Sequence, residues 1–187
     1  AKGFIPDSYN IGIDGSFANW VGTTIVDVKR PLLIVAEEGR EEEVATRLAR
    51  IGFDNTLGYL KGGFEAWINA GKEMETVPSI AVKKLAHKII DEDIHILDVR
   101  RASEYNSEHV ENAINAPLDY LKDSLTKMDK KKTYYVHCGS GYRSMVFVSI
   151  LKSMGYENLI DVKGGINAMK ELGKFKLSEY REPTTML

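Results

Sequence analysis

The chain is poor in cysteine and histidine and has no long apolar run. Its 187 residues include one cysteine, Cys138, so no disulfide can form within the chain. The four histidines are dispersed and, with a single cysteine, do not show the ligand spacing of a zinc site. No apolar run approaches the ~20 residues that span a bilayer, and no secretory signal is visible at the start. We therefore expect no bound metal, no membrane partner and a reduced, cytoplasmic setting.

The chain also lacks an excess of charge of either sign. Its formal net charge is -2 at pH 7 and its basic residues are scattered, which gives no indication of a nucleic-acid surface. The densest basic cluster, Lys130–Lys132, precedes the apolar run Tyr134–Val136 and is predicted to be a solvated turn. What is present is the balance of an ordinary globular protein, with 43% hydrophobic and 28% charged residues. The length suits one large domain or two small ones.

Comparison of the chain with itself indicates a divergent internal repeat. The apolar run Pro31–Ala36 resembles Thr133–Cys138, and each run leads into a loop and then a stretch of helical periodicity. Further on, each copy passes through a short apolar strand into Lys-Gly-Gly, at 61–63 and at 163–165. Ala36 and Cys138 are separated by the same number of positions as Lys61 and Lys163. We interpret the two segments as copies of one fold.

Each helical stretch stops at a glycine, Gly52 in the first copy and Gly155 in the second, as a helix with a left-handed cap would. In the second copy, Ser79 is predicted to cap an amphipathic helix, and Ile94–Val99 and Ala113–Pro117 are predicted strands. The inward face of that helix carries Val82, Leu85, Ala86 and Ile89. Alternating strands and helices predict an α/β fold of three layers, a central parallel sheet with helices on both faces.

The first copy is incomplete at its N-terminal side. We place it at 1–76 and the complete copy at 77–187, with a linker at 71–78. Nothing in the first copy corresponds to the strand 94–99 or to the helix before it, so its sheet would expose unpaired edges. We therefore expect either that the natural chain continues upstream of Ala1 or that these elements were lost. The tail at 181–187 is expected to be mobile.

The loop after the second apolar run has the residue types of an anion-binding turn around a thiol. It reads Cys138, Gly139, Ser140, Gly141, Tyr142, Arg143 and Ser144. The glycines allow a tight turn, and the loop N–H groups and the following helix N-terminus are expected to converge on the sulfur. Such a setting favours the thiolate at neutral pH, and Arg143 adds a positive charge. The alternatives are a buried structural thiol, a surface salt bridge for Arg143 and plain turn chemistry for the glycines.

These motifs, in this order, resemble those of the rhodanese family over about residues 78 to 175. The loop matches a cysteine, four intervening residues, then a basic residue and Ser or Thr. The other matching segments are Leu97–Arg100, Glu104-Tyr105, His109-Val110, the spaced residues Ala113, Asn115 and Pro117, and Val162–Gly165. The resemblance implies a sulfurtransferase that works by ping-pong transfer and needs no cofactor beyond a Cys138 persulfide.

In that reading Cys138 takes a sulfane sulfur from a small donor, thiosulfate or a low-molecular-weight persulfide, and passes it to a thiol or cyanide. Cys138 and Arg143 are the catalytic residues. The residues expected around the substrate are Gly139, Ser140, Gly141, Tyr142 and Ser144. Because Gly139 and Ser140 are neutral, whereas strong thiosulfate users in the family often carry cations there, a persulfide donor is at least as plausible as thiosulfate. Tyr142 is expected either to shield the acceptor or to be a rim aromatic.

Two other functions stay open at this point. One is a phosphatase or arsenate reductase on the same fold, but such loops have five residues between cysteine and arginine, whereas this loop has four and makes a smaller cradle. The other is a non-catalytic rhodanese-type binding or regulatory module, which the presence of Cys138 disfavours.

The resemblance also assigns supporting residues. Asp98 and Arg100, at the end of a central strand, are expected to brace the loop or to form a structural ion pair. Glu104 and His109 are expected to hold the fold. His137 should point to the face opposite Cys138, and we do not assign it as a general base.

The first copy has Ala36 where the nucleophile should be, so it is expected to be inert, with a structural or docking role. Its acidic residues Glu37, Glu38 and Glu41–Glu43 are interpreted as a favourable helix N-terminus. The loop Asp14–Trp20 has no counterpart in the second copy and resembles the inactive repeat behind metallo-β-lactamase-fold domains. This resemblance implies an upstream domain of that kind, such as one of the persulfide dioxygenase type, and any metal would belong there.

Overall fold

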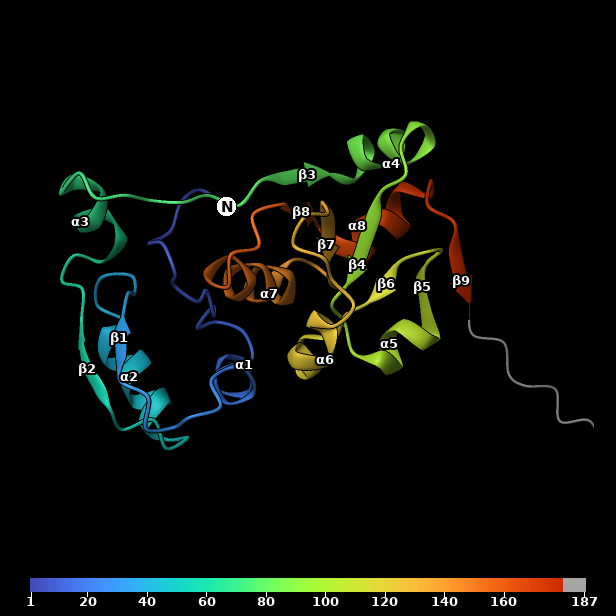
Figure 1. Cartoon of the computed structure of the whole chain (residues 1–187). Coiled ribbons are helices and arrows are strands. Elements are labelled where there is room, and N and C mark those ends of the chain that lie inside the picture. Colours follow the sequence, from blue (N-terminus) through green and yellow to red (C-terminus); the bar gives the residue numbers. More distant parts are fainter. Residues whose placement is uncertain (180–187) are drawn as a thin grey trace, which may run out of the picture. The chain divides into compact units, whose positions relative to one another are not determined.

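The computed structural model describes residues 1–179 and divides the chain into two compact units, Ala1–Thr76 and Val77–Leu187 (Figure 1). Each unit has its own sheet and helices. The tail 181–187, for which we expect mobility, lies outside the described residues. Within the described part of the chain, no helix has both the length and the apolar character needed to cross a membrane.

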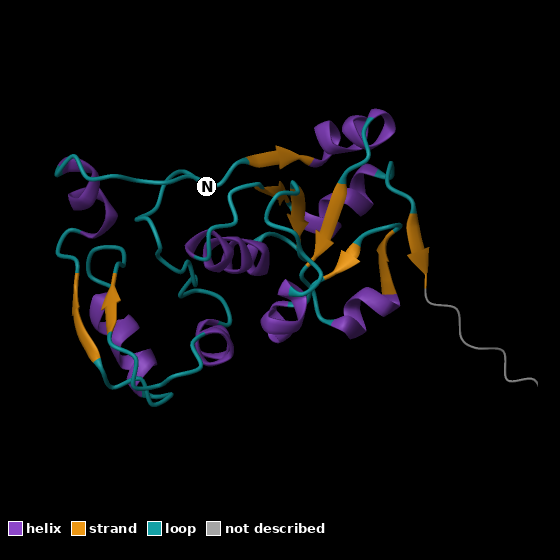
Figure 2. Cartoon of the chain, viewed as in Figure 1, coloured by secondary structure: helices purple, strands orange, loops and turns teal. Residues whose placement is uncertain are grey.

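The second unit is built on a five-stranded parallel sheet (Figure 2). Its spatial order is β3-β8-β7-β4-β6, so β7 lies at the centre, and the strand after it in the chain, β8, lies beside it. The strands are β3 (Ser79–Ala81), β4 (His95–Asp98), β6 (Ile114–Asn115), β7 (Tyr134–His137) and β8 (Leu159–Lys163). A separate antiparallel pair joins β5 (Glu108–Val110) to β9 (Leu177–Glu179).

Helices cover both faces of this sheet, which confirms the predicted α/β class with a central parallel sheet between helices. On one face, residues of α4 and α8 form a core cluster with Tyr135 and Val162. On the other face α7 packs against β7 and β8, and most of its side chains are buried. The helices of this unit are α4 (Val82–Asp91), α5 (Ala102–Ser107), the short 3₁₀ helix η1 (Leu118–Tyr120), α6 (Leu121–Leu125), α7 (Tyr142–Ser153) and α8 (Gly165–Leu172).

The first unit has a sheet of two parallel strands, β1 (Leu32–Ile34) and β2 (Thr56–Tyr59). Its helices are α1 (Phe17–Thr24), α2 (Glu41–Ala49) and α3 (Gly63–Asn69). Ile34 packs with residues of α1 and α2 in a small core, whereas the side chain of Leu33, on the other face of β1, is 77% exposed. The sheet of this unit is therefore covered well on one face only, within the described residues.

One sequence prediction about the second unit is wrong and others are adjusted. Ser79 does not cap a helix, because it lies in β3 and pairs with Asp161, and α4 begins three residues later with Ala81 at its N-cap. Ser79 is held in the edge strand of the sheet by this pairing, so it cannot be the N-cap of α4. The predicted strands are shorter than expected, at His95–Asp98 and Ile114–Asn115. Gly52 and Gly155 both have the left-handed φ that their caps require, 87° and 81°.

Candidate functional site

Cys138 follows β7 directly at the carboxyl end of the sheet, and α7 begins four residues later. Its side chain is buried, at 1% exposed. The N–H of Gly141 donates to Cys138 Sγ at 3.2 Å. Gly141 has a φ of 125°, which a side chain would resist, and this turn brings its N–H back over the sulfur at the N-terminus of α7. The sulfur therefore has polar groups around it at the end of the sheet, and Ser140 of the same loop is exposed.

The N-terminus of α8 holds the backbone of the same loop. The N–H of Ile166 donates to the carbonyl of Cys138 at 2.9 Å, and that of Asn167 donates to the carbonyl of Gly139 at 3.2 Å. A Cβ on Gly165 would lie 2.7 Å from the Gly139 carbonyl oxygen and closer still to that of Cys138. Since the C=O and N–H of a trans peptide point in opposite directions, these bonds turn the next N–H groups of the loop away from α8. The Lys-Gly-Gly motif thus orients the backbone around the thiol.

Arg143 is close to the loop, but its charge is paired. Its guanidinium makes a two-pronged ion pair with the carboxylate of Glu104, with Nη2 and Oε1 2.9 Å apart. The hydrogen bond from Arg143 lowers the pKa of Glu104, and in return Glu104 raises the pKa of Arg143. The guanidinium also lies 3.6 Å from the position of a Cβ on Gly139, so the pair borders the loop. Glu104 additionally accepts the N–H of Arg101 at the start of α5.

Asp98 and Arg100 form a buried ion pair, and both also make polar contacts with nearby groups. Arg100 Nε donates to Asp98 at 3.0 Å, and Arg100 Nη2 donates to the carbonyl of Glu108 at 2.7 Å. The side-chain amide of Asn115 donates to the carbonyls of both residues at 3.0 Å. This network ties the end of β4 to β5 and β6, while the sulfur's own polar contacts come from the loop and α7.

His137 is fully buried, and its Nδ1 lies 3.2 Å from the carbonyl oxygen of Cys138. Burial lowers its pKa, although the nearby Asp98 carboxylate opposes the shift. The imidazole is therefore neutral at pH 7 and contacts backbone, with its Nε2 3.9 Å from Asp98 Oδ2. Tyr142 opens α7 at the rim of the loop and is partly buried, which raises the pKa of its phenol.

Asp161 is the residue near the thiol that sequence reasoning missed. It lies on β8, paired with Val136 of β7, and is 6% exposed. Ser144 Oγ is 2.8 Å from Asp161 Oδ1 and 3.8 Å from Cys138 Sγ. Burial raises the pKa of Asp161, and the hydrogen bond to Ser144 opposes this. The signal was a lone carboxylate in the interior of the apolar run 159–162.

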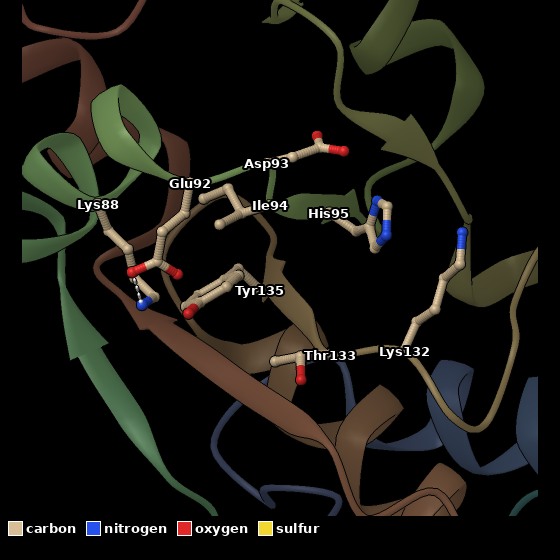
Figure 3. A pocket seen from close by; sticks show the side chains of 8 residues that line it. All are labelled: Lys88, Glu92, Asp93, Ile94, His95, Lys132, Thr133 and Tyr135. Atoms are coloured by element: carbon tan, nitrogen blue, oxygen red, sulfur yellow. Dashed lines mark hydrogen bonds and ion pairs between the residues drawn. The ribbon is translucent and has the colours of Figure 1, made fainter.

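A separate cavity of about 450 Å³ lies at the opposite end of the strands (Figure 3). Ile94 and His95 line it at the amino end of β4, and Thr133 and Tyr135 line it near the amino end of β7. In Figure 3, Lys88 and Glu92 at its rim pair with each other. The cavity mixes both signs of charge, and its lining does not include the loop around Cys138.

Comparisons with known proteins point to one family. The family model described as Rhodanese-like domain matches residues 81–172. The thiosulfate sulfurtransferase PspE of Escherichia coli strain K12 is 38% identical over 72 residues, which cover 37% of this chain and 69% of that protein. The Bacillus subtilis protein YrkF is 29% identical over 107 residues, 57% of this chain, and the chain spans 56% of its length. The solution structure of the rhodanese-like domain of the Anabaena protein Alr3790 superimposes with a TM-score of 0.52 at 26% identity, over 60% of this chain and 86% of that one.

Proposed function

Because the chain belongs to the rhodanese-like domain family, we propose that its second unit is a sulfurtransferase in which Cys138 carries a sulfane sulfur as a persulfide. The observation that supports this best is the placement of the only thiol in the chain. It lies at the end of the central strand, with the Gly141 N–H 3.2 Å from its sulfur and a helix N-terminus above it. A hydrogen-bond donor at that point stabilises negative charge on the sulfur of both the thiolate and the persulfide.

The proposed reaction has two displacement steps. In the first, the Cys138 thiolate attacks the outer sulfur of a donor R–S–SH, the donor S–S bond breaks, and R–S⁻ leaves with the electron pair. Cys138 then holds the sulfur as Cys–S–SH. In the second, an acceptor thiolate attacks that outer sulfur and becomes a persulfide, and the Cys138 thiolate leaves.

The charges around the loop favour a donor of low charge over the thiosulfate dianion. Gly139 and Ser140 are neutral, and the guanidinium of Arg143 is already compensated by Glu104. A dianion would therefore meet little uncompensated positive charge on approach. The 1% exposure of Cys138 further favours a donor that presents its outer sulfur on a narrow, unbranched end. A low-molecular-weight persulfide meets both conditions, and we propose it as the donor class.

The burial of Cys138 also supports a second candidate, a rhodanese-type module that binds a partner without chemistry. Phosphatase or arsenate reductase activity is disfavoured, because four residues separate Cys138 from Arg143 and the cradle is small for an oxyanion.

We propose that residues 1–76 are a divergent, inert copy of the same fold. Gly63 and Gly165 share a φ of 57°, and a Cβ on Gly63 would lie 2.5 Å from the carbonyl oxygen of Ala36 as one on Gly165 would meet that of Cys138. Ala36 thus occupies the place of the nucleophile, and a methyl group cannot attack sulfur. A docking role for this unit, an association with a metallo-β-lactamase-fold domain and a cytoplasmic setting stay predictions.

A transfer assay separates the two candidates. Purified wild type and Cys138→Ser are given an alkyl persulfide or thiosulfate, with cyanide or a thiol as acceptor, and thermal unfolding checks that both variants fold. We expect transfer by wild type and only the uncatalysed rate with Cys138→Ser. Wild-type protein that is folded and no faster than buffer would support the non-catalytic module, and transfer that survives the substitution would remove Cys138 from the reaction.

A further inference from the structure

A short buried polar chain leads from the thiol into the sheet. Cys138 Sγ lies 3.8 Å from Ser144 Oγ, which lies 2.8 Å from Asp161 Oδ1 and 3.0 Å from the carbonyl oxygen of Gly141. All three side chains are buried, and they come from three elements: the end of β7, the first turn of α7, and β8. The N-terminus of α8 also holds the loop backbone, at the carbonyls of Cys138 and Gly139.

The hydroxyl of Ser144 can both donate and accept a hydrogen bond, so it can link the sulfur to the Asp161 carboxylate. It has one proton and two lone pairs, whereas the Gly141 carbonyl and an ionised Asp161 only accept. When Cys138 is a thiol, its S–H can donate to Ser144 Oγ while Ser144 donates to the Asp161 carboxylate. When Asp161 is protonated, its O–H can donate to Ser144 Oγ, and the hydroxyl proton is free to turn toward the sulfur.

Electrostatics favour one proton shared across this chain. A thiolate and a carboxylate that are both buried and so close repel each other, so ionising both is costly. Burial raises the pKa of Asp161, which is the direction that lets a carboxyl group hold a proton more readily. Within the second unit, the other charged groups nearby are Lys163 on β8 and Arg143 on α7, the latter paired with Glu104. His137 at the end of β7 is neutral.

We propose that Asp161, through Ser144, holds the proton that Cys138 gives up, and is thus a positioning residue for the sulfur-transfer site. The inference rests on the proposed function for its role in catalysis. The S–H bond of Cys138 breaks as its proton passes to Ser144 Oγ, and the proton of Ser144 passes to Asp161 Oδ1. The electron pair stays on the sulfur, so the three groups carry one negative charge before and after the step. When the Cys138 thiolate leaves the persulfide in the second displacement, the same path runs backwards.

This sharing has a signature in the pH dependence of thiol reactivity. Between the two ionisations of the pair, the thiolate fraction depends on how one proton is divided between sulfur and carboxylate and not on pH. The rate of alkylation by iodoacetamide should therefore rise in two steps separated by a plateau. With a lone thiol the rate rises about tenfold per pH unit up to its single midpoint. Cys138 is the only cysteine, so mass spectrometry assigns the alkylation without ambiguity.

The experiment compares wild type, Asp161→Asn and Glu171→Gln between pH 4 and 10. Asparagine keeps the shape of Asp161, and Glu171 is an exposed carboxylate on α8 that serves as the matched control. We expect two steps for wild type and Glu171→Gln, and one step for Asp161→Asn, with thermal unfolding confirming that each variant folds. Ser144→Ala should remove the plateau from the rate profile, although the Asp161 carboxyl group is still present.

A single step in wild type, or a profile unchanged by Asp161→Asn, would overturn the inference. Alkylation needs no sulfur donor, so the two proposals fail separately. Sulfur transfer with a one-step profile would refute the shared proton alone. A two-step profile without any persulfide would refute the transferase and leave the shared proton standing.

Discussion

The ion pair between Arg143 and Glu104 should determine how the site responds to the charge of its donor. Glu104→Gln keeps the size of the side chain and its ability to accept a hydrogen bond from Arg143, but it removes the negative charge. The guanidinium, close to the position of Gly139, would then face an incoming donor uncompensated. We expect the variant to use thiosulfate better than wild type does, with a much smaller change for a low-charge persulfide.

The size of the effect follows from Coulomb's law. A donor anion over the loop would lie about 5 Å from the guanidinium, where one charge contributes ~1 kcal/mol at an effective dielectric constant of about 60. Salt at physiological strength reduces this by roughly half. A dianion thus gains about 1 kcal/mol, or roughly sixfold in kcat/KM, and a monoanion roughly two- to threefold. The cost in stability should stay below about 1 kcal/mol, because the Glu104 side chain is 37% exposed.

The assay measures kcat/KM for thiosulfate and for an alkyl persulfide, at low and high salt. Arg143→Ala should slow persulfide formation from anionic donors, since it leaves Glu104 unpaired beside the loop. The double variant Glu104→Gln with Arg143→Ala should lose the thiosulfate gain. The electrostatic reasoning would be refuted if Glu104→Gln raised kcat/KM equally for both donors. It would also be refuted if the gain in kcat/KM for thiosulfate survived high salt or the loss of Arg143.

Other consequences can be measured on the same preparations. Gly165→Ala should abolish sulfur transfer, because the added Cβ clashes with the carbonyls of the loop. Gly63→Ala makes the equivalent clash at Ala36 and should leave transfer intact, with thermal unfolding as the check that both variants fold. Asp98→Ala leaves the buried charge of Arg100 unpaired and should lower the free energy of unfolding by about 3–5 kcal/mol in urea titrations. Burial lowers the pKa of His137 from its ordinary value of 6.5. Below pH 6.5, His137 therefore takes up a proton in the unfolded chain but not in the folded chain. The free energy of unfolding should therefore fall as the pH drops below 6.5, by up to about 1.4 kcal/mol per pH unit for this group, and His137→Gln should remove that share.

The parts of the site that local sequence determines could be predicted. A strand, a glycine-rich turn and a helix follow one another between Tyr134 and Ser153, in the order that the sequence predicts. The two inward apolar positions at the centre of α4, Leu85 and Ala86, are buried as its periodicity predicts.

The parts that depend on distant residues could not. Glu104 lies 39 positions from Arg143, and the contact between Ser144 and Asp161 depends on the register between β7 and β8. Ser79 was misread because nothing local indicates that its backbone joins an edge of the sheet. A polar residue's role is hard to predict when its partner lies on another element.

The most direct test of the central claim is the mass of the purified protein after exposure to an alkyl persulfide and removal of the donor. We predict a gain of one sulfur atom located on Cys138, which an added thiol or cyanide removes. A mass that stays unchanged in folded protein, or added sulfur that appears equally in Cys138→Ser, would contradict the account.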